Sequence, residues 1–372
     1  MNLAACAVSL VMLGCGAVLA QPGAYRIETL THRLSSPAAI AFLPDGRMLV
    51  AQRGGALRLV DAKGILQPDA IPGTPNDGLD DTTGLIDIAL DPDFDTSGRI
   101  FLSYQRGTLR ANHMRLASGE LKNHAGGLEL VNVKALFDAQ PARRGASNFG
   151  GRIAFLPDKT LVLSIGDGFD GREQAQNVAS HLGKIVRLGR DGSVPLGNPF
   201  IGRPGAAPEI FSLGHRNVQG LAFDTNSQRL YANDHGAKGG DEINLLEAGR
   251  NYGWPLATHG KDYIGARVTP YTSLPGLTAA LLHWTPSIAP SSMVVYRGQA
   301  FRGWEGDLLN SSLVGKAVYR VRMVNQQPVQ QEKLFSELDA RIRQVKVGPD
   351  GLIYLLTDEK ENGRLLRVVP VS

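Results

Sequence analysis

Several arginines of this sequence stand next to strand-like segments, where they could bind an anion. Arg216 lies in the motif GHRN, and Arg341 and Arg343 lie in ARIR. Guanidinium groups bind carboxylates through paired donors, so three of them on one surface suit an anionic ligand. Each arginine could instead form an ordinary ion pair with a loop aspartate, and the residues alone leave both interpretations open.

The segment SNFGGR, residues 147–152, has the glycines of a binding loop but no side chain that accepts a proton near neutral pH. Asn148 carries an amide, which has no useful basicity. The strand-like run that follows ends in GDG, which contains Asp167. Residues 147–152 could therefore form part of a binding or active site, or only a turn, and both interpretations stay open.

The densest polar and glycine-rich segment is residues 233–255, NDHGAKGGDEINLLEAGRNYGWP. Glycine lets carbonyl groups approach a ligand closely, and hard cations such as calcium take carbonyl and carboxylate oxygens. A long loop would need the same glycines for its turns, so an ion site and a plain loop are both open. His215 and His235 lack the spacing of a zinc-binding helix.

A repeated hairpin pattern predicts how these segments are positioned. Six copies of an apolar run, a turn rich in Pro, Asp or Gly, a second apolar run and a polar tip begin at residues 38, 86, 151, 219, 293 and 343. Alternating apolar runs joined by such turns are β-hairpins. The repeat predicts an all-β fold, a six-bladed β-propeller. Two all-β domains are the alternative, although no Pro- or Ser-rich linker divides the chain.

The geometry of a hairpin predicts that the polar segments meet. Residues before the first strand and after the second strand lie at the same end of a hairpin. SNFGGR, GHRN and ARIR precede first strands, whereas GDG and DHGAKGGD follow second strands. We therefore expect these segments at one mouth of the propeller, close to its axis.

Composition indicates a folded, exported protein. Of 372 residues, 43% are hydrophobic and 20% are charged, and the net charge of +4 is spread out, which predicts no nucleic-acid groove. The uncharged apolar start predicts a signal peptide over residues 1–20 and a single β-propeller domain over residues 21–372. No other segment approaches the roughly 18 apolar residues that span a membrane. We expect a periplasmic or secreted protein.

Both cysteines, Cys6 and Cys15, lie in the predicted signal peptide. Its removal would leave no thiol, which excludes disulfides, cysteine-bound zinc and thiol catalysis. A lipid anchor at Cys15 is the alternative.

Motifs along most of the chain resemble a known family. They are GLIDIALDPDF, GGRIAFLPD, LSIGDG, GKIVRLGRDGSVPLGNPF, FSLGHRNVQGLAFD, GGDEINLLEAGRNYGWP and SIAPSSMVVY. In this order they resemble the soluble PQQ-dependent aldose and glucose dehydrogenases, the glucose/sorbosone dehydrogenase-like proteins. The resemblance implies a six-bladed propeller that binds pyrroloquinoline quinone (PQQ) through calcium at its mouth. It also implies oxidation of an aldose sugar at C1, with an unknown electron acceptor.

The resemblance further implies roles for individual residues. Cofactor contacts would come from Arg216, Asn217, Asp241, Trp284, Arg341, Arg343 and Thr82. The carbonyl groups of Gly236 and Ala237 would bind the calcium of the cofactor, and Glu242 and Tyr252 match a second, structural calcium site. His235 would line the pocket, and Asp167 would lie behind the catalytic position.

The sequence departs from the family at four positions. Asn148 stands where the family has the histidine that takes the proton of the sugar hydroxyl, and general-base catalysis is typically worth about 10²–10⁴-fold. Thr82 replaces a glutamine that contacts the cofactor, and Val314 replaces a lysine of well-known members. Ala237 stands where proline is usual.

Three hypotheses follow from this mixture of matches and departures. The first is a PQQ-dependent dehydrogenase that uses Asp167 or His235 as its base. The second is a propeller that binds a ligand or partner without turnover. The third is a calcium-dependent hydrolase, which we rank last because the sequence lacks a cluster of carboxylates.

Overall fold

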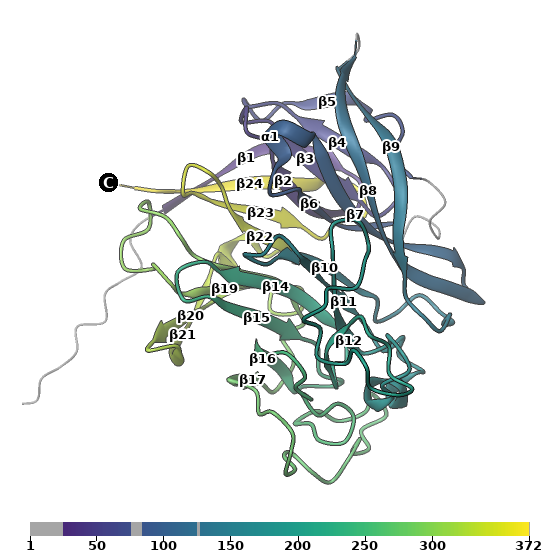
Figure 1. Cartoon of the computed structure of the whole chain (residues 1–372). Coiled ribbons are helices and arrows are strands. Elements are labelled where there is room, and N and C mark those ends of the chain that lie inside the picture. Colours follow the sequence, from purple (N-terminus) through teal and green to yellow (C-terminus); the bar gives the residue numbers. More distant parts are fainter. Residues whose placement is uncertain (1–24, 76–83, 125–126, 372) are drawn as a thin grey trace, which may run out of the picture.

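The computed structural model describes residues 25–75, 84–124 and 127–371, and these residues form six four-stranded antiparallel sheets. The sheets are arranged around a common axis like the blades of a propeller (Figure 1). The predicted six-bladed β-propeller is confirmed. The predicted signal peptide lies outside the described residues.

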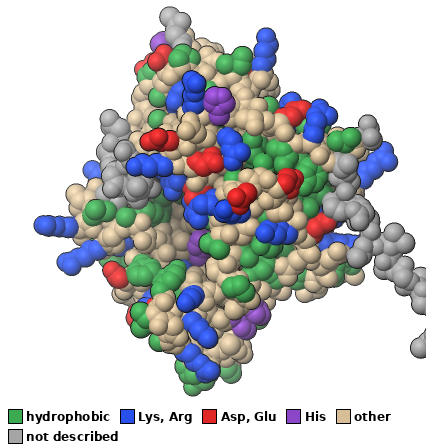
Figure 2. Space-filling view, turned by 180° about the vertical axis from the view of Figure 1, so that it is seen from behind, with side chains coloured by type: hydrophobic (Ala, Val, Ile, Leu, Met, Phe, Trp, Pro, Cys, Tyr) green, Lys and Arg blue, Asp and Glu red, His purple; other side chains and the backbone are tan. Residues whose placement is uncertain are grey.

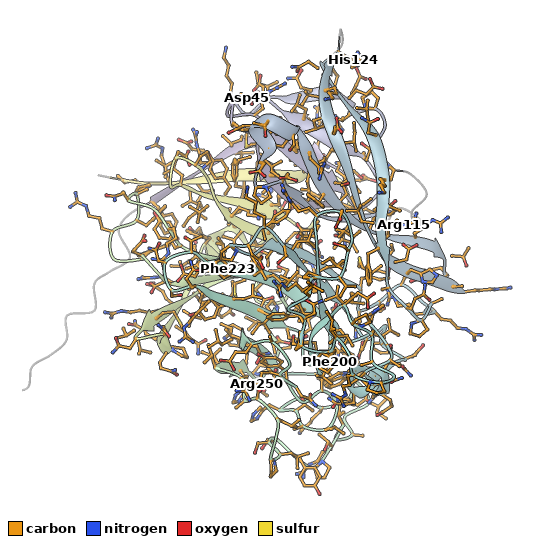
Figure 3. The ribbon with its side chains drawn as sticks, in the orientation of Figure 1. Asp45, Arg115, His124, Phe200, Phe223 and Arg250 are labelled. Atoms are coloured by element: carbon orange, nitrogen blue, oxygen red, sulfur yellow. The ribbon has the colours of Figure 1, made fainter. Side chains whose placement is uncertain are left out.

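The first three blades follow one another along the chain. The first contains β2 (Pro37–Phe42), β3 (Met48–Gln52), β4 (Leu57–Val60) and β5 (Leu66–Ala70). The second contains β6 (Leu85–Leu90), β7 (Arg99–Thr108), β8 (Ala111–His124) and β9 (Gly127–Asp138). The third contains β10 (Gly150–Phe155), β11 (Leu161–Ile165), β12 (Lys184–Leu188) and β13 (Ile210–Leu213). The long β8–β9 hairpin projects from the body, and His124 lies near its tip (Figure 3).

The last three blades repeat the arrangement. The fourth contains β14 (Val218–Asp224), β15 (Arg229–Asp234), β16 (Asp241–Leu246) and β17 (Leu282–Trp284). The fifth contains β18 (Pro290–Val295), β19 (Leu308–Ser312), β20 (Ala317–Val324) and β21 (Gln327–Leu334). The sixth contains β22 (Ile342–Val347), β23 (Ile353–Thr357), β24 (Gly363–Pro370) and the N-terminal strand β1 (Tyr25–Leu34).

The sixth blade joins the two ends of the described chain. Strand β1 pairs antiparallel with β24, and Arg367 forms an ion pair of 2.7 Å with Glu28 across the two strands. The ring is therefore closed by strand pairing between its first and last elements, with β1 as the outer strand of the sixth blade.

Helical structure is short in the described residues. It comprises the single-turn helix α1 (Phe94–Ser97) and the 3₁₀ turns η1 (Arg172–Gln176) and η2 (Ser336–Leu338). Within these residues, no helix has the length and apolar character to cross a membrane.

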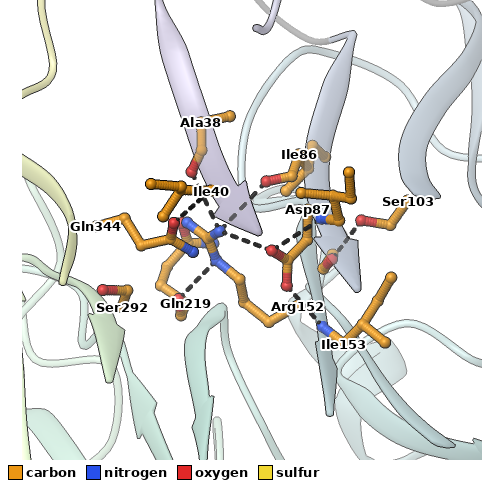
Figure 4. A network of polar contacts seen from close by, with 12 residues as sticks. Ala38, Ile40, Ile86, Asp87, Ser103, Arg152, Ile153, Gln219, Ser292 and Gln344 are labelled. Carbon is orange, nitrogen blue, oxygen red and sulfur yellow. Dashed lines mark hydrogen bonds and ion pairs between the residues drawn. The ribbon is translucent and has the colours of Figure 1, made fainter. Parts of the chain in front are cut away.

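The inner strands, β2, β6, β10, β14, β18 and β22, surround the axis. Buried apolar side chains pack between neighbouring blades, as Leu49 of β3 and Ile88 of β6 do between the first two. Near the axis, the buried Arg152 donates hydrogen bonds to the carbonyl groups of Ala38, Ile86 and Gln219, among others (Figure 4). One arginine from the third blade thus connects several blades at the centre.

Candidate active site

Asn148 and Asp167 meet at one end of the β10–β11 hairpin, as the hairpin geometry predicts. The Nδ2 atom of Asn148 donates a hydrogen bond of 2.8 Å to Oδ1 of Asp167. Asn148 has a φ of 50°, a left-handed conformation that asparagine adopts more readily than most residues. A Cβ atom on Gly166 would lie 2.0 Å from the Asn148 carbonyl oxygen, so the close approach of the two segments requires glycine.

Asp167 is fully buried, and neutral donors hold both of its oxygens. The Phe169 N–H donates to Oδ1 at 2.8 Å, and the Trp254 indole N–H donates to Oδ2 at 2.9 Å. Burial raises the pKa of Asp167, while these donors and the nearby Arg216 oppose the rise. The carboxylate is therefore fixed in orientation and has no fully charged partner in direct contact.

Arg216 precedes β14 and lies beside Asp167. Its backbone carbonyl accepts a hydrogen bond of 2.9 Å from the Asp167 N–H. Its guanidinium donates to the Gly236 carbonyl at 2.6 Å and lies 5.4 Å from the centroid of the Trp254 ring. Among the described residues, no carboxylate is within ion-pair distance of this guanidinium. Its positive charge is therefore available to a ligand.

His235 follows β15 and completes this group. Its Nε2 atom donates to the Pro290 carbonyl, and its backbone N–H donates to the Asn217 carbonyl at 3.3 Å. Burial lowers the pKa of the imidazole, and Arg216 lowers it further. The Nδ1 atom makes no hydrogen bond to the described residues. We call Asn148, Asp167, Arg216, His235 and Trp254 the Asn148 cluster.

A second cluster contains three arginines around one aspartate. Arg53, Arg341 and Arg343 form ion pairs of 2.7, 3.0 and 2.8 Å with Asp358. Although burial raises the pKa of Asp358, the arginines lower it overall. Three guanidinium groups share a single carboxylate, so positive charge is in excess. We call these four residues the Asp358 cluster.

The two clusters lie at the same end of the axis. Residues of each cluster directly precede inner strands, namely β10 and β14 in one case and β22 in the other. On the face seen from behind, acidic and basic side chains are interspersed near the middle (Figure 2). The two clusters themselves place both carboxylates (Asp167 and Asp358) and guanidinium groups at this end of the axis.

Other residues that the sequence analysis assigned to the cofactor have structural partners. Asp241 accepts four hydrogen bonds, from the Ser287 hydroxyl and from the N–H groups of Gly236, Ile288 and Ala289. The Trp284 indole donates to Gln331 at 2.6 Å. Asn217 Oδ1 accepts a hydrogen bond of 3.0 Å from the Gly150 N–H. Thr82 lies outside the described residues.

The residues assigned to calcium surround the loop after β15. A Cβ atom on Gly236 would lie 2.1 Å from the Gly239 carbonyl oxygen, so this turn requires glycine. Ala237 is buried beside it. Burial and the nearby carboxylates Asp234 and Asp241 raise the pKa of Glu242 to about 8.

Tyr252 lies next to Glu242, and both line a small polar cavity. The Tyr252 hydroxyl donates to the Leu245 carbonyl at 2.6 Å, so its phenol is already engaged. Within the described part of the chain, no group of three or more His, Cys, Asp or Glu side chains is arranged to hold a metal ion. A cation here would depend on Glu242 together with carbonyl oxygens.

Comparisons with known proteins agree with this geometry. The family model for glucose/sorbosone dehydrogenases matches residues 34–367. The aldose sugar dehydrogenase YliI of Escherichia coli (strain K12) is 36% identical over 359 residues, 95% of this chain and 95% of that protein. The chain belongs to the glucose/sorbosone dehydrogenase family.

Solved structures of the family have the same fold. The soluble aldose sugar dehydrogenase of Escherichia coli in the apo form superposes with a TM-score of 0.88 at 35% identity, covering 94% of this chain and 100% of that chain. The PQQ-bound aldose sugar dehydrogenase of Streptomyces coelicolor gives a TM-score of 0.72 at 28% identity, covering 94% of this chain and 100% of that chain. The expected resemblance is confirmed, and with it membership of a family of PQQ-dependent sugar dehydrogenases.

Three residues of the two clusters, Arg53, Asp358 and Trp254, were not predicted from the sequence. Arg53 and Asp358 follow the second strands of the first and last hairpins, the same position that identified Asp167. Applying that rule to every hairpin would have found both. Trp254 contacts Asp167 from the long segment between β16 and β17, and no local pattern indicates that contact.

Proposed function

We propose that this protein is an exported PQQ-dependent dehydrogenase that oxidises an aldose sugar at C1 in the periplasm, with Asn148 in the position of the family's catalytic histidine. The observation that carries the proposal is the Asn148–Asp167 hydrogen bond beside Arg216. Residues 1–20 would be its signal peptide. PQQ, when bound, supplies the two-electron acceptor for the hydride that leaves C1.

The charges at the mouth suit PQQ, a tricarboxylate. Arg341 and Arg343 belong to a cluster in which three arginines share Asp358, and Arg216 has no carboxylate partner among the described residues. Carboxylates bind such guanidinium groups through charge-assisted hydrogen bonds. We therefore assign the carboxylates of the cofactor to these arginines, with Asn217 beside them.

Two groups of oxygen donors fit calcium, a hard cation. The carbonyl groups of Gly236 and Ala237 would hold the ion of the cofactor, next to Arg216. Glu242 and a carbonyl group near Tyr252 would hold a second ion, because a cation would compensate the charges of Asp234 and Asp241 that act on the partly buried Glu242 carboxyl group. Asp241 and Trp284 would support the pocket wall from behind.

The proton of the sugar hydroxyl needs an acceptor other than Asn148. We assign this role to His235 rather than Asp167, because His235 is partly exposed and its Nδ1 atom has no partner among the described residues. Both oxygens of the buried Asp167 already accept hydrogen bonds. The amide oxygen of Asn148 would orient the hydroxyl, since its Nδ2 atom is held by Asp167.

Titration of the purified mature protein with PQQ and calcium, followed by aldoses and a dye acceptor, tests this proposal. We expect binding and turnover, and a His235→Gln variant that binds PQQ but loses at least about 100-fold in kcat. The matched control is His113→Gln, because the His113 ring on β8 also bonds a carbonyl group, that of Ala139 at 2.8 Å, and belongs to neither cluster. Absence of PQQ binding would overturn the proposal, and binding without turnover of any aldose would establish a non-catalytic binding propeller.

A further inference from the structure

A cavity of about 410 Å³ lies at the end of the axis opposite the mouth. Residues from all six inner strands line it, and they come from the C-terminal halves of these strands. The mouth residues stand at the N-terminal ends of the same strands. Arg152 and its carbonyl partners near the beginnings of the strands separate the cavity from the mouth (Figure 4).

One position of the cavity wall breaks the six-fold pattern. The equivalent residues of the six inner strands, in order from β2 to β22, are Ala41, Ala89, Ala154, Ala222, Val294 and Lys346. Five blades place a small apolar side chain here, so the packing of the fold does not require a lysine. Lys346 is therefore the one cation among these six positions.

The Lys346 amine has no hydrogen bond or ion pair with the described residues. Asp87 and Arg152 are the charged groups that act on it, and they lie 3.6 Å from each other. Arg297 also lines the cavity, but Asp224 and Glu305 pair with it at 2.7 Å each. Lys346 is partly exposed on the cavity wall, and desolvation of its amine lowers its pKa, so an opposite charge in the cavity would stabilise the ammonium.

An anion would compensate this charge. Leaving a charge in apolar surroundings without a partner is costly, and a carboxylate within contact distance of the amine removes that cost. The other lining side chains are largely aliphatic and aromatic, with Phe42, Phe155 and Phe223 among them, and polar atoms are exposed between them. A carboxylate would pair with the Lys346 amine, and an apolar body attached to it would contact the apolar side chains, whereas a small inorganic anion would use only the amine.

We propose that this cavity is a second binding site, which takes a small molecule with one carboxylate on an apolar body and uses Lys346 as the counter-ion. The volume is within the range of sites for small molecules, about 300–1,000 Å³. The site is separate from the cofactor site and does not depend on the proposed catalytic function.

Calorimetric titration of the full mature protein with octanoate tests the proposal, with octanol and inorganic phosphate as probes that lack one of the two features. We expect octanoate to bind, with and without PQQ, and both other probes to bind at least 10-fold more weakly. Lys346→Met, which keeps the length of the side chain, should weaken octanoate binding at least 10-fold. Lys316→Met removes an exposed lysine paired with Asp339 and should leave it unchanged.

A second variant keeps the proposal falsifiable if Lys346→Met fails to fold. Ala89→Leu retains the amine but fills part of the cavity, and it should also weaken octanoate binding at least 10-fold. Octanoate should protect Lys346 from amine-labelling reagents, as read by mass spectrometry. No octanoate binding to the wild-type protein, or binding that neither variant weakens, would overturn the proposal, as would equal binding of phosphate.

Discussion

The two clusters at the mouth handle charge in opposite ways. In the Asn148 cluster, neutral groups hold the charged side chains: an amide, an indole and a backbone N–H hold Asp167, and a carbonyl group holds Arg216. In the Asp358 cluster, the charges pair directly, but three guanidinium groups share one carboxylate. The Asn148 cluster fixes the orientation of its charged side chains without neutralising them. The Asp358 cluster has more positive than negative side chains.

The difference indicates that the Asp358 cluster binds anionic groups and that the Asn148 cluster acts in proton transfer. A surplus of guanidinium groups binds anionic groups of any small ligand that fits. A carboxylate held by neutral donors and an imidazole held by a carbonyl acceptor keep their orientation and act on protons. We therefore expect variants of the Asp358 cluster to change affinity, and variants of the Asn148 cluster to change turnover.

Asn148→His should raise turnover strongly, because it introduces a base next to Asp167. Histidine tolerates the positive φ of this position better than most residues. We expect kcat with an aldose to rise about 100-fold, at the lower end of what a general base is worth, while the affinity for PQQ stays unchanged. Asn226→His on the exposed turn after β14 is the control. An unchanged kcat in a folded, PQQ-binding variant would show that the Asn148 cluster does not limit proton transfer.

Arg343→Gln should mainly weaken binding of PQQ. Hydrogen bonds to charged groups are worth about 1.5–3 kcal/mol, which corresponds to a loss of about 10–150-fold in affinity. Arg53 and Arg341 remain paired with Asp358, so the aspartate stays compensated. Fluorescence titration with PQQ checks the change, with Arg367→Gln on the outer strand pair as the control. A loss of kcat at saturating PQQ, with affinity unchanged, would contradict the proposed division.

The repeated hairpins made the inner strands and the meeting of the polar segments predictable. Asn148 with Asp167, and Arg216 with Gly236, come together because each pair flanks one hairpin. The closing strand β1 was not predictable, because its pairing with β24 joins distant parts of the chain. Outer strands such as β5 are short and exposed, so they lack the apolar alternation that identifies a strand.

The contact between Trp254 and Asp167 was also beyond sequence reasoning. Trp254 comes from a long segment without regular strands in the fourth blade. Its indole reaches Asp167, which follows β11 of the neighbouring third blade. Such a contact depends on how the segment folds over the mouth, which no short-range pattern encodes. The contribution of this hydrogen bond to the free energy of unfolding can be measured with a Trp254 variant.

Trp254→Phe should have the smallest effect, a loss of about 1–3 kcal/mol in the free energy of unfolding, because one oxygen of the buried Asp167 loses its donor. Burial already raises the pKa of Asp167, and loss of a donor to the ionised form raises it further. A group whose folded pKa is raised contributes stability at low pH and loses it as the pH rises through that pKa. The loss in the free energy of unfolding caused by Trp254→Phe should therefore be larger at pH 8 than at pH 4.

Urea unfolding of both proteins at these two pH values checks the prediction. Trp304→Phe is the matched control, because the Trp304 ring is equally buried and its indole N–H makes no hydrogen bond to the described residues. Its deficit should not depend on pH. If the loss in stability of Trp254→Phe were also independent of pH, the loss would arise from the packing of the ring. That outcome would contradict the idea that neutral donors hold the Asp167 carboxylate in place.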